Sequence, residues 1–130
     1  MRRVSTRRPS FPKARPNKLL PVKPKLRWQV ICGDTGHWRV GIYSPPESSR
    51  KEVEELERHD CPEFFLLLTG ALTLVLLENG KLRELPLKAG KPILVTSPHS
   101  GFCPAGPHTG TALVVERDEF ETEYRDADEW

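Results

Sequence analysis

The sequence predicts an all-β domain, closed as a barrel or stacked as a sandwich. Short apolar segments recur about every eight to twelve residues and are separated by turns rich in glycine and proline. Asn79-Gly80 lies between two apolar runs, and this dipeptide is a strong hairpin signal because both residues accept positive φ angles. Helical periodicity is almost absent. Together these observations favour strands along the globular part of the chain.

The first two expected strands cover residues 26–33 and 37–43, where apolar and polar residues alternate. Gly33-Asp34 forms a turn between them, so the two strands make a hairpin. Residues 44–50 are expected to be a loop, since Pro45-Pro46 offers no donors to a strand ladder.

Residues 51–59 fit two structures. Val53 and Leu56 are three apart, as in a helix, whereas Glu57 and His59 point the same way in a strand. We favour the strand, because its alternation gives the two polar side chains a common direction.

Five more strands are expected where apolar runs end in turn residues. They cover residues 63–68, 71–77, 81–87, 92–96 and 111–117. Residues 97–110 are rich in proline and glycine and are expected to be a loop that carries His99, Cys103 and His108.

Charge divides the chain into three parts. Residues 1–27 hold ten Lys or Arg and no acidic residue, so the remainder holds ten basic and eighteen acidic residues. We expect residues 1–25 to be a basic, proline-rich disordered tail, because it has too few apolar groups to offset its ordering entropy. Residues 26–120 form the expected barrel domain and residues 121–130 an acidic C-terminal tail, either loose or a short helix.

Several partners and locations are not expected. No recognisable nucleic-acid-reading module accompanies the basic tail, so nucleic-acid binding is not expected. No apolar run reaches 18 residues, so no membrane span is expected. The three cysteines, Cys32, Cys61 and Cys103, are an odd number without paired spacing, and no apolar leader is visible. These features indicate a cytoplasmic protein.

The stretch from residue 57 to residue 70 holds the densest set of candidate metal ligands. Glu57, His59, Cys61 and Glu63 precede an apolar run, and strand alternation would send Glu57 and His59 to one face. In a closed barrel that face would look inward; in an open sheet it would look at water. Cys61 is more simply explained as a small buried hydrophobe.

The spacing resembles that of small single-domain cupins of the cupin-2 type, which are double-stranded β-helix or jelly-roll barrels. The first cupin motif ends in a Glu, six residues and a Gly, matched here by Glu63 and Gly70, with His59 ahead of them. The second runs from a Gly to a Pro-His pair, matched by Gly90 and Pro98-His99. The resemblance covers about residues 38–117 and implies the barrel fold.

The sequence departs from the cupin pattern at three points. Glu57 stands where the first motif has a His, and Lys91 stands where an Asp is common. The second motif is also about two residues short. Pro107-His108 offers an alternative to Pro98-His99, although Pro98-His99 follows the apolar strand directly and is preferred.

The resemblance implies a divalent transition metal, Fe, Mn, Ni or Zn, held by His59, Glu63 and His99, with Glu57 as a fourth ligand. Two imidazoles with one or two carboxylates suit these ions and leave positions for a ligand. The alternative is that the carboxylates are solvated at the barrel mouth and the histidines bond to backbone. We expect the side chains of the four residues to meet in one interior.

A ligand pocket is expected beside this site. Its candidate lining residues are Trp38, Tyr43, Phe65, Phe102 and His108. Each aromatic residue is also ordinary core filling.

Cupins include dioxygenases, isomerases, epimerases, storage proteins and sensing domains, so fold alone does not fix a function. We expect a domain that binds a small molecule in its barrel, as a binding or sensing module. The alternative is a metal-dependent enzyme, a dioxygenase or an isomerase or epimerase. A homodimer is expected in either case.

Overall fold

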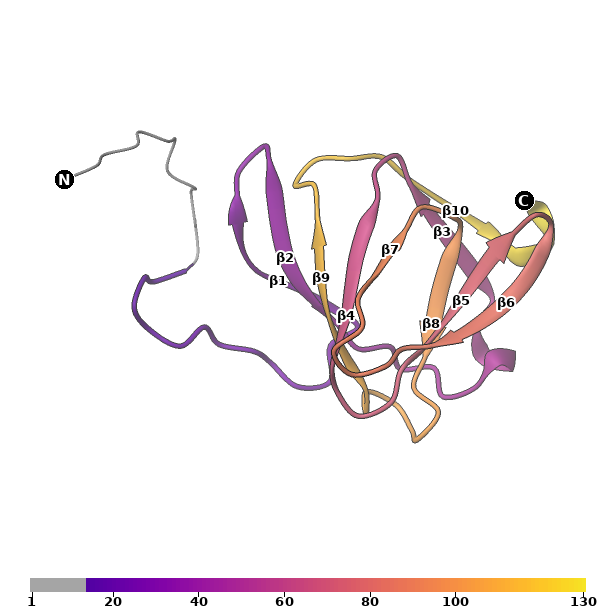
Figure 1. Cartoon of the computed structure of the whole chain (residues 1–130), viewed down its shortest axis with the longest axis horizontal. Coiled ribbons are helices and arrows are strands. Elements are labelled where there is room, and N and C mark those ends of the chain that lie inside the picture. Colours follow the sequence, from indigo (N-terminus) through magenta and orange to yellow (C-terminus); the bar gives the residue numbers. More distant parts are fainter. Residues whose placement is uncertain (1–13) are drawn as a thin grey trace.

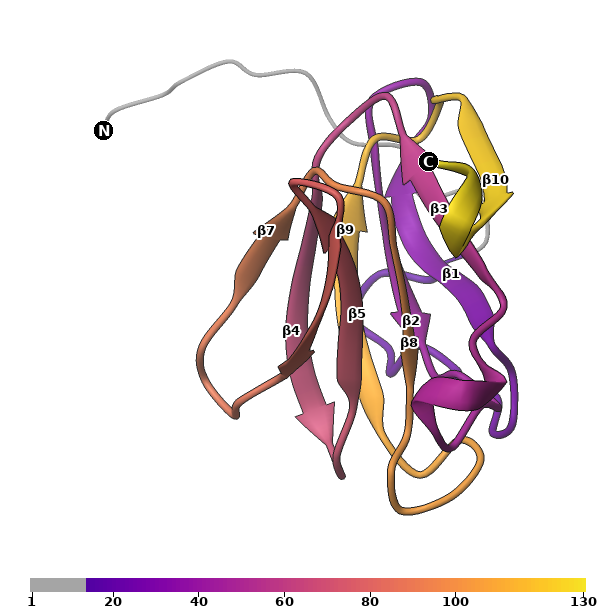
Figure 2. The same ribbon diagram turned by 90° about the vertical axis from the view of Figure 1, so that its right-hand side faces the viewer.

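In the computed structural model, which describes residues 14–130, the chain forms two five-stranded antiparallel sheets that face each other (Figures 1 and 2). The first sheet has the order β1 (Trp28–Asp34), β2 (Trp38–Tyr43), β9 (Thr111–Glu116), β4 (Glu63–Thr69), β7 (Ile93–Val95). The second has the order β10 (Thr122–Asp126), β3 (Glu55–His59), β8 (His99–Phe102), β5 (Thr73–Glu78), β6 (Lys81–Pro86). The predicted all-β class is confirmed.

Two apolar clusters stabilise the sheets. The larger fills the space between them and joins Phe65 and Val114 of the first sheet to Leu74 and Leu76 of the second. The smaller lies on the other face of the second sheet, by strand alternation, and consists of Val53, Leu56, Val75 and Phe102. Burial of these side chains is the main force that holds the layers together.

The turns follow the predicted chemistry. Asn79 and Gly80 have φ angles of 52° and 75°, as a tight hairpin between β5 and β6 requires. The hairpin of β1 and β2 also forms, but Gly33 and Asp34, expected as its turn, are the last residues of β1, and the turn lies at residues 35–37. Residues 51–59 resolve into a short 3-10 turn, η1 (Arg50–Glu52), followed by β3.

Two expectations need correction. The segment expected as a loop, 97–110, contains β8, which pairs with both β3 and β5 in the centre of the second sheet. The segment expected as an acidic tail, 121–130, contains β10, which pairs with β3, and a second 3-10 turn, η2 (Ala127–Glu129). Both strands are short and polar, so neither shows the apolar run by which strands are recognised in a sequence.

The described part of the basic N-terminal segment, residues 14–27, lies outside both sheets (Figure 1). Residues 14–27 have no regular secondary structure and are mostly exposed. The rest of the expected disordered tail, residues 1–13, lies outside the described residues. Within residues 14–130 no helix is long and apolar enough to span a membrane.

Gly70 occupies the position at which the cupin motif requires a glycine. Its φ is +67°, and a Cβ atom there would come within 2.1 Å of the Thr109 carbonyl oxygen. Gly90 has a similar φ of +74°, but a Cβ atom there would have no neighbour within 4 Å. Substitutions at Gly90 and Gly70 therefore distinguish the cost of backbone strain alone from the cost of strain together with a steric clash.

We expect Gly90→Ala to lower the free energy of unfolding by about 1 kcal/mol, the cost of a left-handed alanine. Gly70→Ala should lower it by roughly 2–4 kcal/mol, because the clash with Thr109 adds to the same strain. Urea unfolding of both variants measures the difference. Equal losses would mean that the contact between the Gly70 turn and Thr109 is not close.

Candidate metal centre

A cavity of about 480 Å³ lies between the two sheets. Its wall combines aromatic rings with a concentration of charged side chains, including two histidines. A space of this size accepts a small organic molecule.

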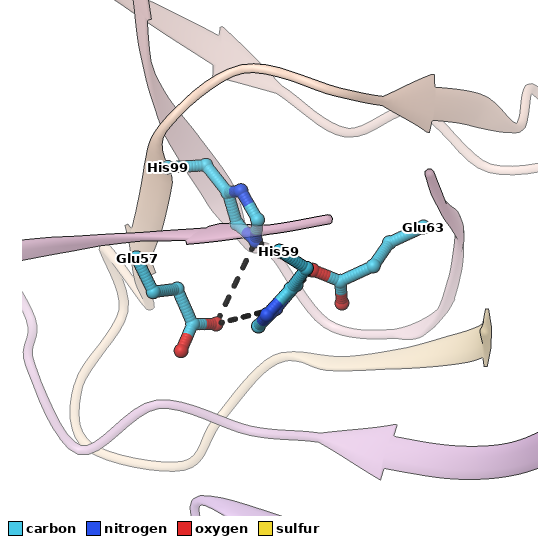
Figure 3. A group of neighbouring side chains, drawn as sticks. All are labelled: Glu57, His59, Glu63 and His99. Carbon is cyan, nitrogen blue, oxygen red and sulfur yellow. Dashed lines mark ion pairs between the residues drawn. The ribbon is translucent and has the colours of Figure 1, made fainter. Parts of the chain in front are cut away.

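Four side chains from separate parts of the chain converge in this cavity (Figure 3). Each of Glu57, His59, Glu63 and His99 offers one ligand atom, and these atoms all lie within 4.8 Å of one another. Glu63 Oε1 is 2.5 Å from His59 Nε2 and 2.9 Å from His99 Nε2. Glu57 Oε1 is 3.6 Å from both nitrogens. We call these four residues the His-Glu cluster.

Strand geometry explains why the cluster forms. Glu57 and His59 are two apart in β3 and so share a face, and Glu57 pairs directly with His99 of β8. Glu63 is the first residue of β4 in the opposite sheet and points the same way as buried Phe65. The cluster therefore bridges the two sheets.

The buried atoms of the cluster lack ordinary partners. His99 Nδ1 donates a hydrogen bond to the Ser97 carbonyl at 2.9 Å, which leaves Nε2 directed toward the cluster. His99 Nε2 and Glu63 Oε1 are both buried, and neither has a properly oriented hydrogen bond within residues 14–130, although they are close together. Buried polar atoms in this condition are rare and call for an explanation. A cation between them would satisfy both lone pairs.

The strand β10 completes the surroundings of the cluster. His59 Nδ1 lies 2.7 Å from Thr122 Oγ1, and the His59 ring packs at 4.6 Å against the ring of Phe120. Tyr124 pairs across the ladder with Glu57 and lines the cavity. Thr122 thus fixes the orientation of His59 through Nδ1, while Nε2 points into the cluster, as is usual for a metal-binding histidine.

A second charged group lies beside the cluster in the first sheet. Arg39 Nε donates to Glu116 Oε1 at 3.0 Å, and the two residues are cross-strand partners in β2 and β9. The Glu116 side chain is only 2% exposed. Both residues line the cavity.

The mutual proximity of the cluster groups shifts their protonation. Burial favours a lower pKa for His59, but the carboxylates of Glu57 and Glu63 outweigh it and raise that pKa to about 10. Burial favours a higher pKa for Glu63, but the two imidazoles lower it to about 2. Burial likewise opposes charge on His99, yet Glu63 raises its pKa as well. Without a metal, His59 therefore holds a proton at neutral pH, and Glu63 favours protonation of His99 against the effect of burial.

The pKa of Glu116 shifts in the opposite direction from that of Glu63. Burial raises its pKa, and the negative charge of Glu63 raises it further, to about 7, although Arg39 acts to lower it. This carboxyl group consequently changes charge near neutrality.

The donor set fits a divalent first-row transition metal. Two neutral imidazole nitrogens and two carboxylate oxygens are ligands that Fe, Mn, Ni and Zn accept, and four protein ligands leave positions open on a six-coordinate ion. The buried, unpartnered atoms of Glu63 and His99 support the fit from the structure itself.

The residues expected to line a pocket divide into two groups. Tyr43 and Phe65 line the cavity, whereas Trp38, Phe102 and His108 are absent from its lining within residues 14–130. Trp38 is one position away from Arg39 and so lies on the other face of β2, and Phe102 belongs to the smaller apolar cluster. His108 donates from Nδ1 to the Ser44 carbonyl at 2.8 Å, outside the cavity.

Several lining residues escaped the sequence analysis. Glu116 lies at the end of β9, in step with inward-facing Ala112 and Val114, so alternation within the strand carried a usable signal. Arg39 has the same relation to Tyr43 in β2. Thr122 and Tyr124 gave no such signal, because β10 was not predicted, and Phe120 lies outside any strand, in the segment between β9 and β10.

Comparison with known proteins shows which solved structures share this fold. No protein-family model matches the sequence, and no curated protein matches it. Among solved structures, a cupin-2 domain protein from Shewanella frigidimarina is similar with a TM-score of 0.54 and 14% identity, over 74% of this chain and 84% of that one.

Two enzymes are similar to the same extent. Hydroxypropylphosphonic acid epoxidase from S. wedmorenis, solved with fosfomycin, has a TM-score of 0.53 and 15% identity over 77% of this chain and 55% of its own. DMSP lyase DddQ from Ruegeria pomeroyi has a TM-score of 0.52 and 18% identity over 75% of this chain and 49% of its own. The chain thus spans about half the length of each enzyme. Similarity at this identity establishes the architecture, and the architecture of this chain is that of the cupins.

Proposed function

We propose that the protein binds a divalent transition metal through the His-Glu cluster and uses it to hold a small molecule in the cavity between the sheets. The observation that carries this proposal is the convergence of four nitrogen and oxygen ligand atoms from three strands, β3, β4 and β8, within 4.8 Å of one another. Buried polar atoms must be partnered, and a cation at this position would be a common partner for all four groups.

The protein residues have distinct tasks in this proposal. His59, His99 and Glu63 hold the metal from within the barrel, and Glu57, whose side chain is 32% exposed, lies on the open side. A metal bound there would supply Lewis-acid polarisation of a ligand oxygen. Phe65 and Phe120 supply apolar walls that exclude water from the ligand.

A metal-dependent enzyme is the second candidate, and Glu116 favours it. This buried carboxyl group lies in the cavity beside Glu63 without belonging to the His-Glu cluster, so it could accept a proton from a bound molecule. The similarity to an epoxidase and a lyase is compatible with catalysis. The expected homodimer and cytoplasmic location stay predictions.

We expect protein purified without an affinity tag to retain about one transition-metal ion per chain. His59→Ala and His99→Ala should lose most of it, while His108→Asn should retain it, because His108 lies outside the cavity and Asn tolerates its φ of 60°. Elemental analysis by mass spectrometry measures the content. Metal-free wild-type protein that also fails to take up Fe, Mn, Ni or Zn would refute the proposal.

Thr122→Val should weaken metal binding by roughly 10- to 100-fold, because it removes the hydroxyl group that fixes His59. The matched control is Thr69→Val, which removes a similar exposed contact between Thr69 and Thr111 away from the cavity. Competition with a chelator of known affinity gives both dissociation constants. Equal metal affinities in the two variants would show that β10 does not orient the imidazole of His59.

The metal-free protein should lose stability as the pH rises from 7.5 to 10. The folded state holds a proton on His59 with a pKa of about 10, above the ordinary 6.5, so its contribution is full below 6.5 and disappears through about 10. Glu116, whose raised pKa affects stability between 4.5 and about 7, is already ionised in this range.

Thermal unfolding in excess chelator measures this loss, and His59→Gln provides the baseline for other titrating groups. The wild type should lose more stability than the variant across the same interval. Parallel curves would mean that the imidazole of His59 is not held by the two carboxylates.

A further inference from the structure

Arg39 is held rigidly at the cavity wall. Its guanidinium carbon lies 4.9 Å from the centre of the Phe120 ring and 5.8 Å from that of the Trp28 ring, and its Nε donates to Glu116. The side chain is 25% exposed. Its two terminal nitrogens donate no hydrogen bond within residues 14–130, and the residue lines both this cavity and a smaller hollow beside β1.

The placement of Trp28 depends on a glycine. The Trp28 ring lies over Gly41, where a Cβ atom would come within 2.2 Å of the ring. The absence of a side chain at Gly41 thus lets the ring lie flat on the inner face of the sheet, near Arg39. The guanidinium is consequently fixed on two sides by aromatic rings and on one edge by a carboxylate.

Arg39 is also at a useful distance from the His-Glu cluster. Arg39 pairs with Glu116 across the ladder, and the register of β9 with β4 places Glu116 beside Glu63. Neighbouring strands bring paired Cα atoms to about 5 Å, so the Cα atoms of Arg39 and Glu63 are about 10 Å apart. A molecule with about four to six atoms between its ends can therefore reach both.

The other charged side chains that line the cavity outside the cluster are mostly glutamates, and one of them, Glu47, is paired with the second lining arginine. Arg27 uses both terminal nitrogens on Glu47, at 3.0 and 2.7 Å. Glu52 accepts hydrogen bonds from Ser48. Of the two arginines that line the cavity within residues 14–130, Arg39 is the one whose terminal nitrogens donate no hydrogen bond.

We propose that the molecule held in the cavity is a small organic acid, whose carboxylate pairs with the open edge of Arg39 while an oxygen at its other end reaches the metal. The planar fork of arginine matches a carboxylate with two parallel hydrogen bonds. This inference rests on the proposed metal site for the second contact, but the contact with Arg39 does not need the metal.

The test uses straight-chain dicarboxylates from malonate to adipate, titrated calorimetrically into protein whose metal content has been measured. At least one should bind, and Arg39→Gln should weaken its binding on the order of 10- to 100-fold, since a hydrogen bond to a charged group is lost. Arg83→Gln, the control, should bind within about twofold of the wild type, because Arg83 pairs with Glu78 away from the cavity. The diamide of the same length should be insensitive to Arg39→Gln.

Arg39→Gln leaves buried Glu116 without its partner, so the double variant with Glu116→Gln keeps the pair neutral and protects the fold. It should show the same loss of dicarboxylate binding with an unchanged metal content.

The failures of the two proposals can be told apart. If the wild type takes up no metal, the metal proposal fails. The anion site is then tested separately with pentanoate, which has a single carboxylate. Binding of pentanoate to the metal-free protein that is lost in Arg39→Gln still supports the anion site. Metal-loaded protein that binds no dicarboxylate, that binds the diamide equally well, or that prefers 1,5-diaminopentane would overturn the inference.

Discussion

The geometry of the cavity depends on the burial of mutually compensating polar groups between two apolar sheets. Glu63 enters the interior from the first sheet and meets His59 and His99 from the second, so attraction between them crosses the barrel. Each group alone would be costly to bury, since an unpaired buried charge loses its hydration without return. Together they fix the spacing of β3, β4 and β8, and the surrounding cavity takes its shape from that spacing.

Much of the fold follows from patterns that are local in the sequence. The hairpin at Asn79-Gly80 and the glycine at Gly70 are specified by the φ angles their turns need, and both were predicted. β8 and β10 were missed for the opposite reason. Their residues become strands because neighbouring strands offer hydrogen-bonding partners, and partners distant in sequence leave no local trace.

The site was predictable only where alternation or motif spacing carried information. The convergence of the His-Glu cluster followed from two-residue spacing in β3 and from the likeness to cupin motifs, and the structure brings these side chains together. The cavity wall was not predictable in the same way. Phe102 is aromatic and near His99, yet its odd offset from that residue turns it to the other face of the strand, where it packs with Val75. The aromatic character of Phe102 alone predicts the cavity face of β8, whereas its position in the strand turns it to the opposite face.

The cavity draws its walls from both ends of the described chain, and this has a consequence for how the protein is made. Trp28 and Arg39 are synthesised before Phe120, Thr122 and Tyr124, which pack on Arg39 or on the cluster. A nascent chain that has reached β9 can pair the strands of the first sheet but cannot yet enclose the cavity. The cavity can therefore be enclosed only after β10 has been synthesised and has paired with β3.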